Sequence, residues 1–294
     1  MRLVTRGDLD GLACAVIATS HEKIDEILLV HPQEITDRKV EVGKDDILAN
    51  VPYDPRCGKW FDHHLITENN VRPAASFEGK FGIAPSAAHL VWEYYGREPR
   101  FETLVKETDR LDGARLTRED VLAPEGYILF GYTLDGRSGL GSYEEYFKRS
   151  VEWLKSLPIE EVLRQPEVAH LVDRLKSETG NFLHTMEAVS ELKENVIYTD
   201  LRPLDDVPPG NRFLIYTIFP DANVSLRIHW GPKKDFVVAA AGHSIFNRTC
   251  RTNLSVLMSR YGGGGHAGAA TTPLPPMSAN EAIEEILAEL IKNG

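Results

Sequence analysis

The first half of the sequence alternates short apolar runs with helical segments, and this order strongly limits the possible folds. Apolar runs at 3–5, 27–30, 47–49 and 59–61 have the length of buried strands, whereas 12–19, 86–95 and 101–111 show helical spacing of apolar residues. Parallel neighbouring strands need a crossover connection, which is usually a helix. The alternation therefore predicts an α/β fold in which a mostly parallel N-terminal sheet is flanked by helices.

The second half has a different pattern. Residues 143–192 stay helical and polar, and strand-like runs follow at 196–198, 213–219, 224–230 and 236–241, separated by Asp, Pro and Gly turns. A helix at 253–261, a glycine-rich loop at 262–266 and a helix at 279–291 complete the chain. We expect a first domain over 1–150, a helical connector over 151–194 and a smaller C-terminal α/β domain over 195–294.

Composition narrows the classes of function. The chain has 294 residues and a formal net charge of −11, which argues against binding long duplex nucleic acid through its backbone. No run approaches the roughly 20 apolar residues of a membrane-spanning helix, and the N-terminus lacks a signal-peptide pattern. Three cysteines without zinc-ligand spacing are typical of a reducing compartment, so we expect a cytoplasmic protein without a membrane partner.

Acidic and imidazole side chains follow two of the predicted strands. Asp8 and Asp10 come directly after the first strand, and Asp62, His63 and His64 follow the run 59–61. The carboxyl ends of parallel strands meet at one edge of a sheet, where ligands bind in open α/β folds. Carboxylates and imidazoles suit Mn²⁺ or Mg²⁺, and Asp62 is placed to orient an imidazole. If the backbone of 8–10 is extended, both carboxylates point to one side and can hold metal for phosphoryl transfer.

Three motifs resemble those of the DHH phosphoesterase family with its usual C-terminal substrate-binding domain. They are Arg6–Gly11, Asp62–His64 and Gly262–Ala270, and they occur in the family's order over essentially the whole chain. The resemblance implies a dinuclear manganese site between two domains. Members of the family include RecJ-type exonucleases, oligoribonucleases, phosphatases of 3′-phosphoadenosine 5′-phosphate, cyclic dinucleotide phosphodiesterases and exopolyphosphatase-like proteins.

The resemblance also implies roles for individual residues. Asp8, Asp10 and His63 would bind metal, and His64 would contact a substrate phosphate. A further metal-binding aspartate is expected after a helical stretch, and the segment 106–113 offers Asp109 and Asp112 as alternatives.

Two positions depart from the family's pattern. Arg6 stands two residues before Asp8, where the family often has a histidine, and Asn50 stands where a metal-bridging aspartate is usual. A neutral amide bridges two cations less well than a carboxylate, so we expect one of the two metal sites to be weak or missing. The guanidinium of Arg6 can instead neutralise phosphate charge in the catalytic site. Asp54 is an alternative replacement ligand.

The predicted C-terminal domain carries candidate substrate ligands. Gly263, Gly264 and Gly265 allow backbone N–H groups to approach an anion closely, and His266 can add a donor. The family resemblance places this loop over the substrate. Arg227, in the run 224–230, resembles part of the family's substrate-binding segment and would bind a terminal phosphate through two hydrogen bonds.

Together these patterns predict a metal-dependent phosphoesterase, with one or two Mn²⁺ or Mg²⁺ ions, that hydrolyses a short oligonucleotide or a nucleoside phosphate. Two alternatives stay open. The departures at Arg6 and Asn50 favour a non-catalytic nucleotide or phosphate sensor on a degraded site, and an exopolyphosphatase-like enzyme would keep catalysis but change the substrate. A homodimer is one assembly state that the sequence leaves open.

Overall fold

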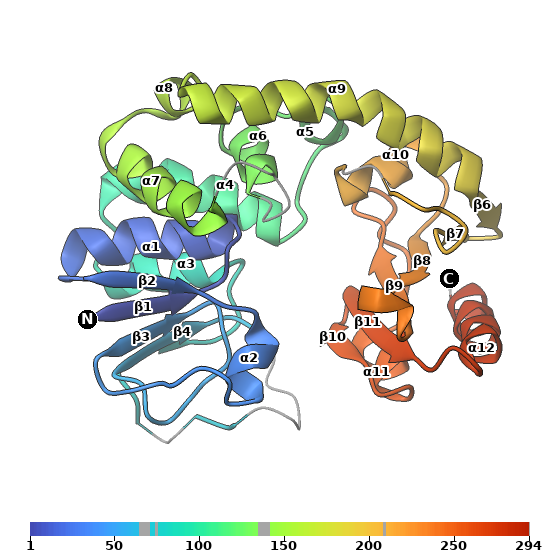
Figure 1. Ribbon diagram of the computed structural model, residues 1–294, viewed down its shortest axis with the longest axis horizontal. Helices are drawn as coiled ribbons and strands as arrows, with labels where there is room; N and C mark the ends of the chain where they lie inside the picture. The colour runs from blue at the N-terminus through green and yellow to red at the C-terminus, as the bar shows by residue number, and fades with distance from the viewer. Residues whose placement is uncertain (65–70, 74–75, 135–141, 208–209, 294) are drawn as a thin grey trace. The chain divides into compact units, whose positions relative to one another are not determined.

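The computed structural model describes residues 1–64, 71–73, 76–134, 142–207 and 210–293 (Figure 1). The chain divides into two compact units, Met1–Leu116 with Pro124–Asp173, and Thr117–Ala123 with Arg174–Gly294. The boundary between them falls within the 24-residue helix α9 (Pro166–Val189). Each unit has its own sheet, with two apolar cores in the first unit and one in the second among the described residues. Within the described ranges, no helix combines the length and the apolar character needed to cross a bilayer.

The first unit contains a five-stranded sheet in the order β2-β1-β3-β4-β5, and every pair of neighbours is parallel. The strands are β1 (Arg2–Thr5), β2 (Glu26–Leu29), β3 (Asp46–Ala49), β4 (Lys59–Asp62) and β5 (Gly79–Phe81). The helices are α1 (Leu9–His21), α2 (Pro32–Thr36), α3 (Ala87–Tyr94), α4 (Glu102–Asp112), α6 (Gly126–Thr133), α7 (Tyr143–Ser156) and α8 (Ile159–Val162). The predicted parallel sheet with flanking helices is confirmed.

Successive residues of these strands contribute to two different cores. Leu3 and Phe61 pack with residues of α1, α3 and α7, whereas Val4 and Trp60 pack with Ile35 of α2 on the opposite face. Because both faces are covered, the strands are continuous apolar runs rather than alternating ones. This explains why the strands could be recognised from short apolar runs. Packing on both faces also holds the strands in place, and with them the starts of the loops at their carboxyl ends.

The second unit contains a six-stranded mixed sheet in the order β10-β11-β9-β8-β7-β6, in which only the pair β7 and β8 is parallel. Helices α11 and α12 contribute apolar residues to the core of this unit, and Figure 1 shows α12 beside the sheet. The strands are β6 (Ser190–Lys193), β7 (Val196–Asp200), β8 (Val224–Trp230), β9 (Val237–His243), β10 (Gly264–His266) and β11 (Ala269–Leu274). The helices are α5 (Arg118–Leu122), α10 (Ile215–Ile218), α11 (Leu254–Ser259) and α12 (Ala279–Lys292), with part of α9.

Two segments of the second unit differ from the sequence prediction. The run 213–219 was predicted to be a strand, but it forms a 3₁₀ turn and the short helix α10. The side chain of Asn211 accepts a hydrogen bond from the N–H of Phe213 at 2.9 Å and so caps this helical turn. A short apolar run does not by itself distinguish a strand from a buried helical turn. The predicted helix reaching residue 192 ends at Val189 instead, and Ser190–Lys193 forms the edge strand β6.

Candidate metal site

Asp10 lies in the first turn of α1, just beyond the carboxyl end of β1, and its side chain is only 1% exposed. Its two oxygens accept hydrogen bonds from the backbone N–H groups of Ala87 (2.9 Å) and Ala88 (2.7 Å), the first residues of α3. Burial raises the pKa of Asp10 well above its usual value, and the charges of Asp112 and Asp8 add to this effect. A carboxylate that is removed from water and surrounded by other acids favours a bound cation.

His63 and Asp112 meet Asp10 at this edge of the sheet. Nε2 of His63 lies 3.3 Å from Oδ2 of Asp112 and 3.7 Å from Oδ2 of Asp10. One ligand atom from each of the three residues lies within 4.8 Å of the other two. Partial removal from water raises the pKa of Asp112, although the nearby His63 opposes this, and 30% of its side chain stays exposed. Two carboxylates and one imidazole are a ligand set that suits Mn²⁺.

The tautomer of His63 fits a cation at this position. Its Nδ1 lies 3.1 Å from the carbonyl oxygen of Ala84, which can only accept a hydrogen bond, so Nδ1 carries a proton. Nε2 is buried and makes no hydrogen bond to any described residue, and in the neutral ring that a metal ligand requires it presents a lone pair. A lone pair that faces two carboxylates is unfavourable unless a cation lies among them. The residues therefore fit a divalent metal ion, with the Ala84 carbonyl orienting the imidazole.

Asp8 has different surroundings from Asp10. It is the N-cap of α1, and its Oδ1 accepts hydrogen bonds from the N–H of Gly11 (2.9 Å) and from Nδ2 of Asn50 (3.1 Å). Its Oδ2 lies 3.1 Å from Nε of Arg6. The assumption of an extended backbone over 8–10 is wrong, because α1 begins directly after Asp8 and Asp10 lies in its first turn. Asp8 is not part of the group formed by Asp10, His63 and Asp112. The guanidinium of Arg6 compensates its charge.

Backbone geometry explains why Asn50 and Gly11 occupy their positions near Asp8. Asn50 is fully buried and adopts a left-handed conformation with φ of 59°, which Asn tolerates better than most residues. Its Oδ1 is buried and makes no hydrogen bond within the described part of the chain. A Cβ atom on Gly11 would lie 2.0 Å from the carbonyl oxygen of Arg6, so the turn from β1 into α1 requires glycine at this position.

Asp10, His63 and Asp112 together are called the metal group. His64 follows His63 of this group in the sequence, and its ring is hydrogen-bonded by Asp62. Oδ1 of Asp62 lies 2.6 Å from Nδ1 of His64 and accepts a hydrogen bond from the N–H of His63 at 2.9 Å. The orienting role predicted for Asp62 therefore applies to the ring of His64. Burial lowers the pKa of His64, but the hydrogen bond and the charge of Asp62 outweigh it, and the pKa is raised above its usual value. The positively charged imidazole, which suits contact with a phosphate, is thereby favoured.

Asp109 and Asp112 are three residues apart on α4, and the structure brings only Asp112 into the metal group. Oδ1 of Asp109 accepts a hydrogen bond from Oγ of Ser86 at 2.6 Å, and its Oδ2 lies 2.8 Å from Nδ1 of His89. Asp109 therefore stabilises the first turn of α3, whose N–H groups hold Asp10. The sequence prediction missed this role of Ser86 and His89, although an N-cap serine before an apolar helix was a usable signal.

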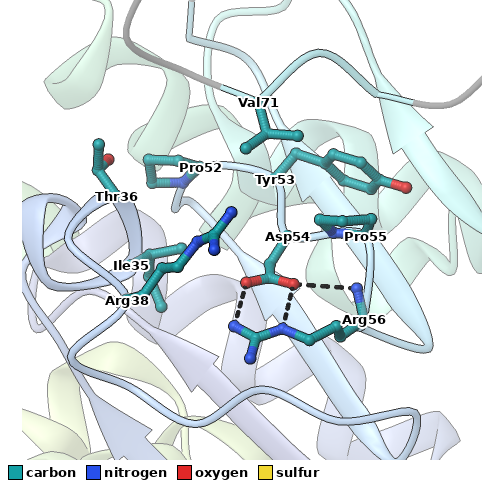
Figure 2. A pocket seen from close by; sticks show the side chains of 9 residues that line it. All are labelled: Ile35, Thr36, Arg38, Pro52, Tyr53, Asp54, Pro55, Arg56 and Val71. Carbon is teal, nitrogen blue, oxygen red and sulfur yellow. Dashed lines mark hydrogen bonds and ion pairs between the residues drawn. The ribbon is translucent and has the colours of Figure 1, made fainter.

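Asp54 is not brought into the metal group as a replacement ligand. Its carboxylate accepts hydrogen bonds from three nitrogens of Arg56, namely the backbone N (2.9 Å), Nε (2.9 Å) and Nη2 (2.6 Å). These side-chain hydrogen bonds lower the pKa of Asp54. Figure 2 shows this pair at the wall of a separate pocket.

Arg227 of the second unit lies on β8, in a row of small residues that crosses the sheet. It pairs with Ala240 of β9, which pairs with Thr271 of β11, and Thr271 pairs with Gly264 of β10. Directly paired residues point to the same face of a sheet. The neighbours of Arg227 on this side of the sheet are therefore small residues.

The glycine-rich segment of the second unit is only partly a loop. Gly264–His266 forms β10, an edge strand paired with β11, so the prediction of a loop over 262–266 is wrong for these residues. A Cβ atom on Gly263 would lie 2.2 Å from the carbonyl oxygen of Thr271, and one on Gly265 would lie 2.5 Å from that of Ala269. These two glycines therefore permit the close approach of two backbones, a requirement that the sequence prediction did not consider.

Comparison with known proteins supports the family resemblance. No protein-family model and no curated protein matches the sequence. The solved structure of PggH, a pGpG-specific phosphodiesterase from Vibrio cholerae, is 34% identical with a TM-score of 0.80, and the match covers 100% of this chain and 99% of that one. RecJ from Thermus thermophilus in complex with Mn²⁺ is 11% identical with a TM-score of 0.58, over 99% of this chain and 52% of that one. A manganese-bound exonuclease RecJ is 12% identical with a TM-score of 0.52, over 98% and 89%.

The two RecJ structures share the fold at low identity, whereas PggH also shares a third of its sequence along the full length. The motifs that follow β1 and β4 meet at one edge of the sheet, and together with Asp112 of α4 they form a group suited to a divalent ion. The chain belongs to the DHH family of metal-dependent phosphoesterases.

Proposed function

We propose that this phosphoesterase hydrolyses short linear dinucleotides of the pGpG type with the help of one divalent metal ion. The observation that carries the metal part is the group of Asp10, His63 and Asp112, in which the buried Nε2 of the imidazole faces two carboxylates without a hydrogen bond to the described residues. The substrate part is supported by PggH, which is similar over the whole chain and whose specificity is for pGpG.

Asp10, His63 and Asp112 would hold one Mn²⁺ or Mg²⁺ ion. When bound, the ion would polarise the scissile phosphate as a Lewis acid. The N–H groups of Ala87 and Ala88 keep the carboxylate of Asp10 oriented toward this position. The Ala84 carbonyl keeps the lone pair of His63 directed the same way. Such fixed ligands reduce the reorganisation that would otherwise oppose ion binding.

Arg6 would provide the positive charge that a second metal ion provides in a dinuclear site. Its Nε lies 3.1 Å from Oδ2 of Asp8, and 36% of its side chain is exposed. The guanidinium has further donors besides Nε, and these can bind a phosphate in two-point fashion. Asp8 would then act as the anchor of Arg6 and not as a metal ligand.

His64 would bind a phosphate oxygen or protonate the leaving oxygen, since Asp62 stabilises its charged form. Arg227 and His266 of the second unit would bind a phosphate group of the substrate. The N–H of Gly263 already donates to the carbonyl oxygen of Met258 at 3.0 Å, so backbone donors from the glycine-rich segment would come from Gly264 or Gly265 of the edge strand β10.

Turnover of pGpG in the presence of Mn²⁺ tests this proposal. A panel of pGpG, 3′-phosphoadenosine 5′-phosphate, a cyclic dinucleotide and tripolyphosphate would be assayed with the unmodified chain and with Asp112→Asn. We expect pGpG to be preferred, a chelator to abolish hydrolysis, and Asp112→Asn to lower kcat/KM by at least about 100-fold, as expected for a metal ligand. Preference for another compound would overturn the substrate assignment, and full activity of Asp112→Asn would overturn the metal assignment.

A second candidate function is a nucleotide sensor without turnover. The observation that favours it is the arrangement of Arg6, Asp8 and Asn50, in which hydrogen bonds and an ion pair already occupy the first carboxylate of the motif. Titration calorimetry with pGpG, combined with product analysis, separates the two functions. Saturable binding without product, in the presence of Mn²⁺, would identify the sensor.

A further inference from the structure

A pocket in the first unit lies apart from the metal group, where the segments that follow β2 and β3 meet (Figure 2). Its volume is about 190 Å³, and Asp10, His63 and Asp112 do not line it. Both segments leave the carboxyl ends of parallel strands, the edge at which open α/β sheets bind their ligands. The position alone makes this pocket a candidate binding site, and its lining indicates the kind of ligand.

The charged side chains of the pocket leave one positive charge in excess. Arg38, Asp54 and Arg56 line it, and their formal charges sum to +1 in a chain whose net charge is −11. Arg56 and Asp54 neutralise each other through two side-chain hydrogen bonds of 2.9 and 2.6 Å. The side chain of Arg38 makes no hydrogen bond or ion pair with any described residue, and Figure 2 shows its guanidinium between Pro52 and Asp54. The pocket therefore presents a cation without a bonded partner among the described residues.

The backbone holds Arg38 in a conformation that usually favours glycine. Helix α2 ends in a Schellman motif, in which the N–H of Lys39 donates to the carbonyl of Glu34 at 2.8 Å and the N–H of Arg38 donates to that of Ile35 at 3.0 Å. Arg38 occupies the left-handed position of this motif with φ of 55°. An arginine there is less favourable for the backbone than glycine, which is consistent with a use for its side chain.

Apart from Thr36, the remaining residues of the wall are apolar or aromatic, and the volume of the pocket limits the size of the ligand. Ile35 and Tyr53 are nearly buried, and Pro52 lies beside them at the pocket. The ring of Tyr53 is fixed against Trp60, with 5.0 Å between ring centroids. A cavity of about 150 Å³ is known to hold benzene, so a pocket of this size suits a single ring with one attached group. It is smaller than the roughly 300 Å³ at which typical pockets for drug-sized ligands begin.

We propose that this pocket binds a small organic anion, a ring-sized apolar body with one carboxylate or phosphate-type group, and that Arg38 is its charge partner. The apolar body would contact Ile35, Pro52 and Tyr53, and the anionic group would accept hydrogen bonds from the guanidinium of Arg38. The Asp54–Arg56 pair lies beside Arg38 in the wall of the pocket and adds no net charge.

Binding of benzoate and of phenylphosphonate tests the proposal, because neither compound has a phosphoester bond that the enzyme could cleave. Titrations would follow the Nε–H signals of ¹⁵N-arginine-labelled protein, and the signal missing from Arg38→Gln identifies Arg38. Benzyl alcohol serves as the neutral ring. Arg164→Gln is the matched control, because it also removes one arginine of the first unit but lies outside the pocket.

We expect one or both anions to shift the Arg38 signal saturably, with about tenfold weaker binding to Arg38→Gln and unchanged binding to Arg164→Gln, as the loss of one charge-assisted hydrogen bond predicts. The stronger of the two anions identifies the preferred group. Benzyl alcohol should bind more weakly than either. Equal affinity of Arg38→Gln and the unmodified protein, or the absence of a saturable Arg38 shift with both anions, would overturn the proposal.

Discussion

Nε of Arg6 lies 3.1 Å from Oδ2 of Asp8, so a guanidinium compensates the charge of the first carboxylate in the motif that follows β1. The other oxygen of Asp8 accepts hydrogen bonds from the Gly11 N–H and from Nδ2 of Asn50. Hydrogen bonds and an ion pair thus hold Asp8 in place at the start of α1. In the proposed site Asp8 anchors Arg6 instead of binding metal, and this role leads to the first prediction.

The unmodified chain is expected to bind about one Mn²⁺ ion, and the double variant Arg6→His with Asn50→Asp about two, because the variant adds an imidazole and a carboxylate beside Asp8. Elemental analysis after dialysis against Mn²⁺ measures the ratio of metal to chain. Arg6→Gln is the control, since it removes the guanidinium without adding a ligand, and it should stay near one ion. Two ions in the unmodified chain would contradict the proposed role of Arg6.

Asp112→Asn and Asp109→Asn form a matched pair of substitutions on α4. Asp112→Asn is expected to weaken Mn²⁺ binding by more than about tenfold while leaving the metal-free protein at least as stable, since it removes a carboxylate whose charged form is disfavoured by burial. Asp109→Asn is expected to lower the free energy of unfolding by about 1–3 kcal/mol, because Ser86 and His89 lose a charged partner.

Titration calorimetry with Mn²⁺ and urea unfolding without metal separate these two effects. If Asp109→Asn loses more metal affinity than Asp112→Asn, the assignment of the two aspartates is reversed.

Gly11→Ala is expected to destabilise the protein by about 1–3 kcal/mol, because its methyl group would lie 2.0 Å from the carbonyl oxygen of Arg6 and would displace the turn that positions Asp8 and Asp10. Gly43→Ala is the control in the same unit, since nothing lies within 4 Å of a Cβ atom there. Thermal unfolding of both variants measures the difference. Equal midpoints would show that the turn can adapt to a side chain.

Glu93→Gln is expected to make stability less sensitive to acid. Hydrogen bonds from Lys80 and then from Arg97 lower the pKa of Glu93 to about 2. A carboxylate with a lowered pKa contributes stability that is fully present above its unfolded value of 4.5 and is lost as the pH falls from there toward 2.

Solvent screens both cationic partners of Glu93, so the contribution is about 1 kcal/mol. Urea unfolding between pH 6 and pH 3 should therefore show a smaller loss of stability for Glu93→Gln than for the unmodified chain. An equal loss of stability in both proteins would show that Glu93 does not contribute to the acid sensitivity.

The sequence by itself was sufficient for the α/β architecture and for the edge of the sheet at which the candidate metal site lies. Buried parallel strands are continuous apolar runs, and the short runs that end at Thr5 and Phe61 are each followed by acidic or imidazole residues. Because parallel strands align their carboxyl ends, two motifs about 50 residues apart must meet at one edge of the sheet. That consequence follows from topology and does not depend on side-chain detail.

Only the tertiary structure decided which residues form the metal group. Asp109 and Asp112 are one helical turn apart and equivalent in sequence, but the packing of α4 against α3 directs Asp109 toward Ser86 and Asp112 toward His63. Asp8 and Asp10 are likewise separated by the start of α1. Secondary-structure propensity and residue spacing describe neighbours along the chain. Which aspartate faces His63 depends instead on how a helix is rotated relative to the sheet. That rotation is set by long-range packing of apolar side chains, which no local pattern records.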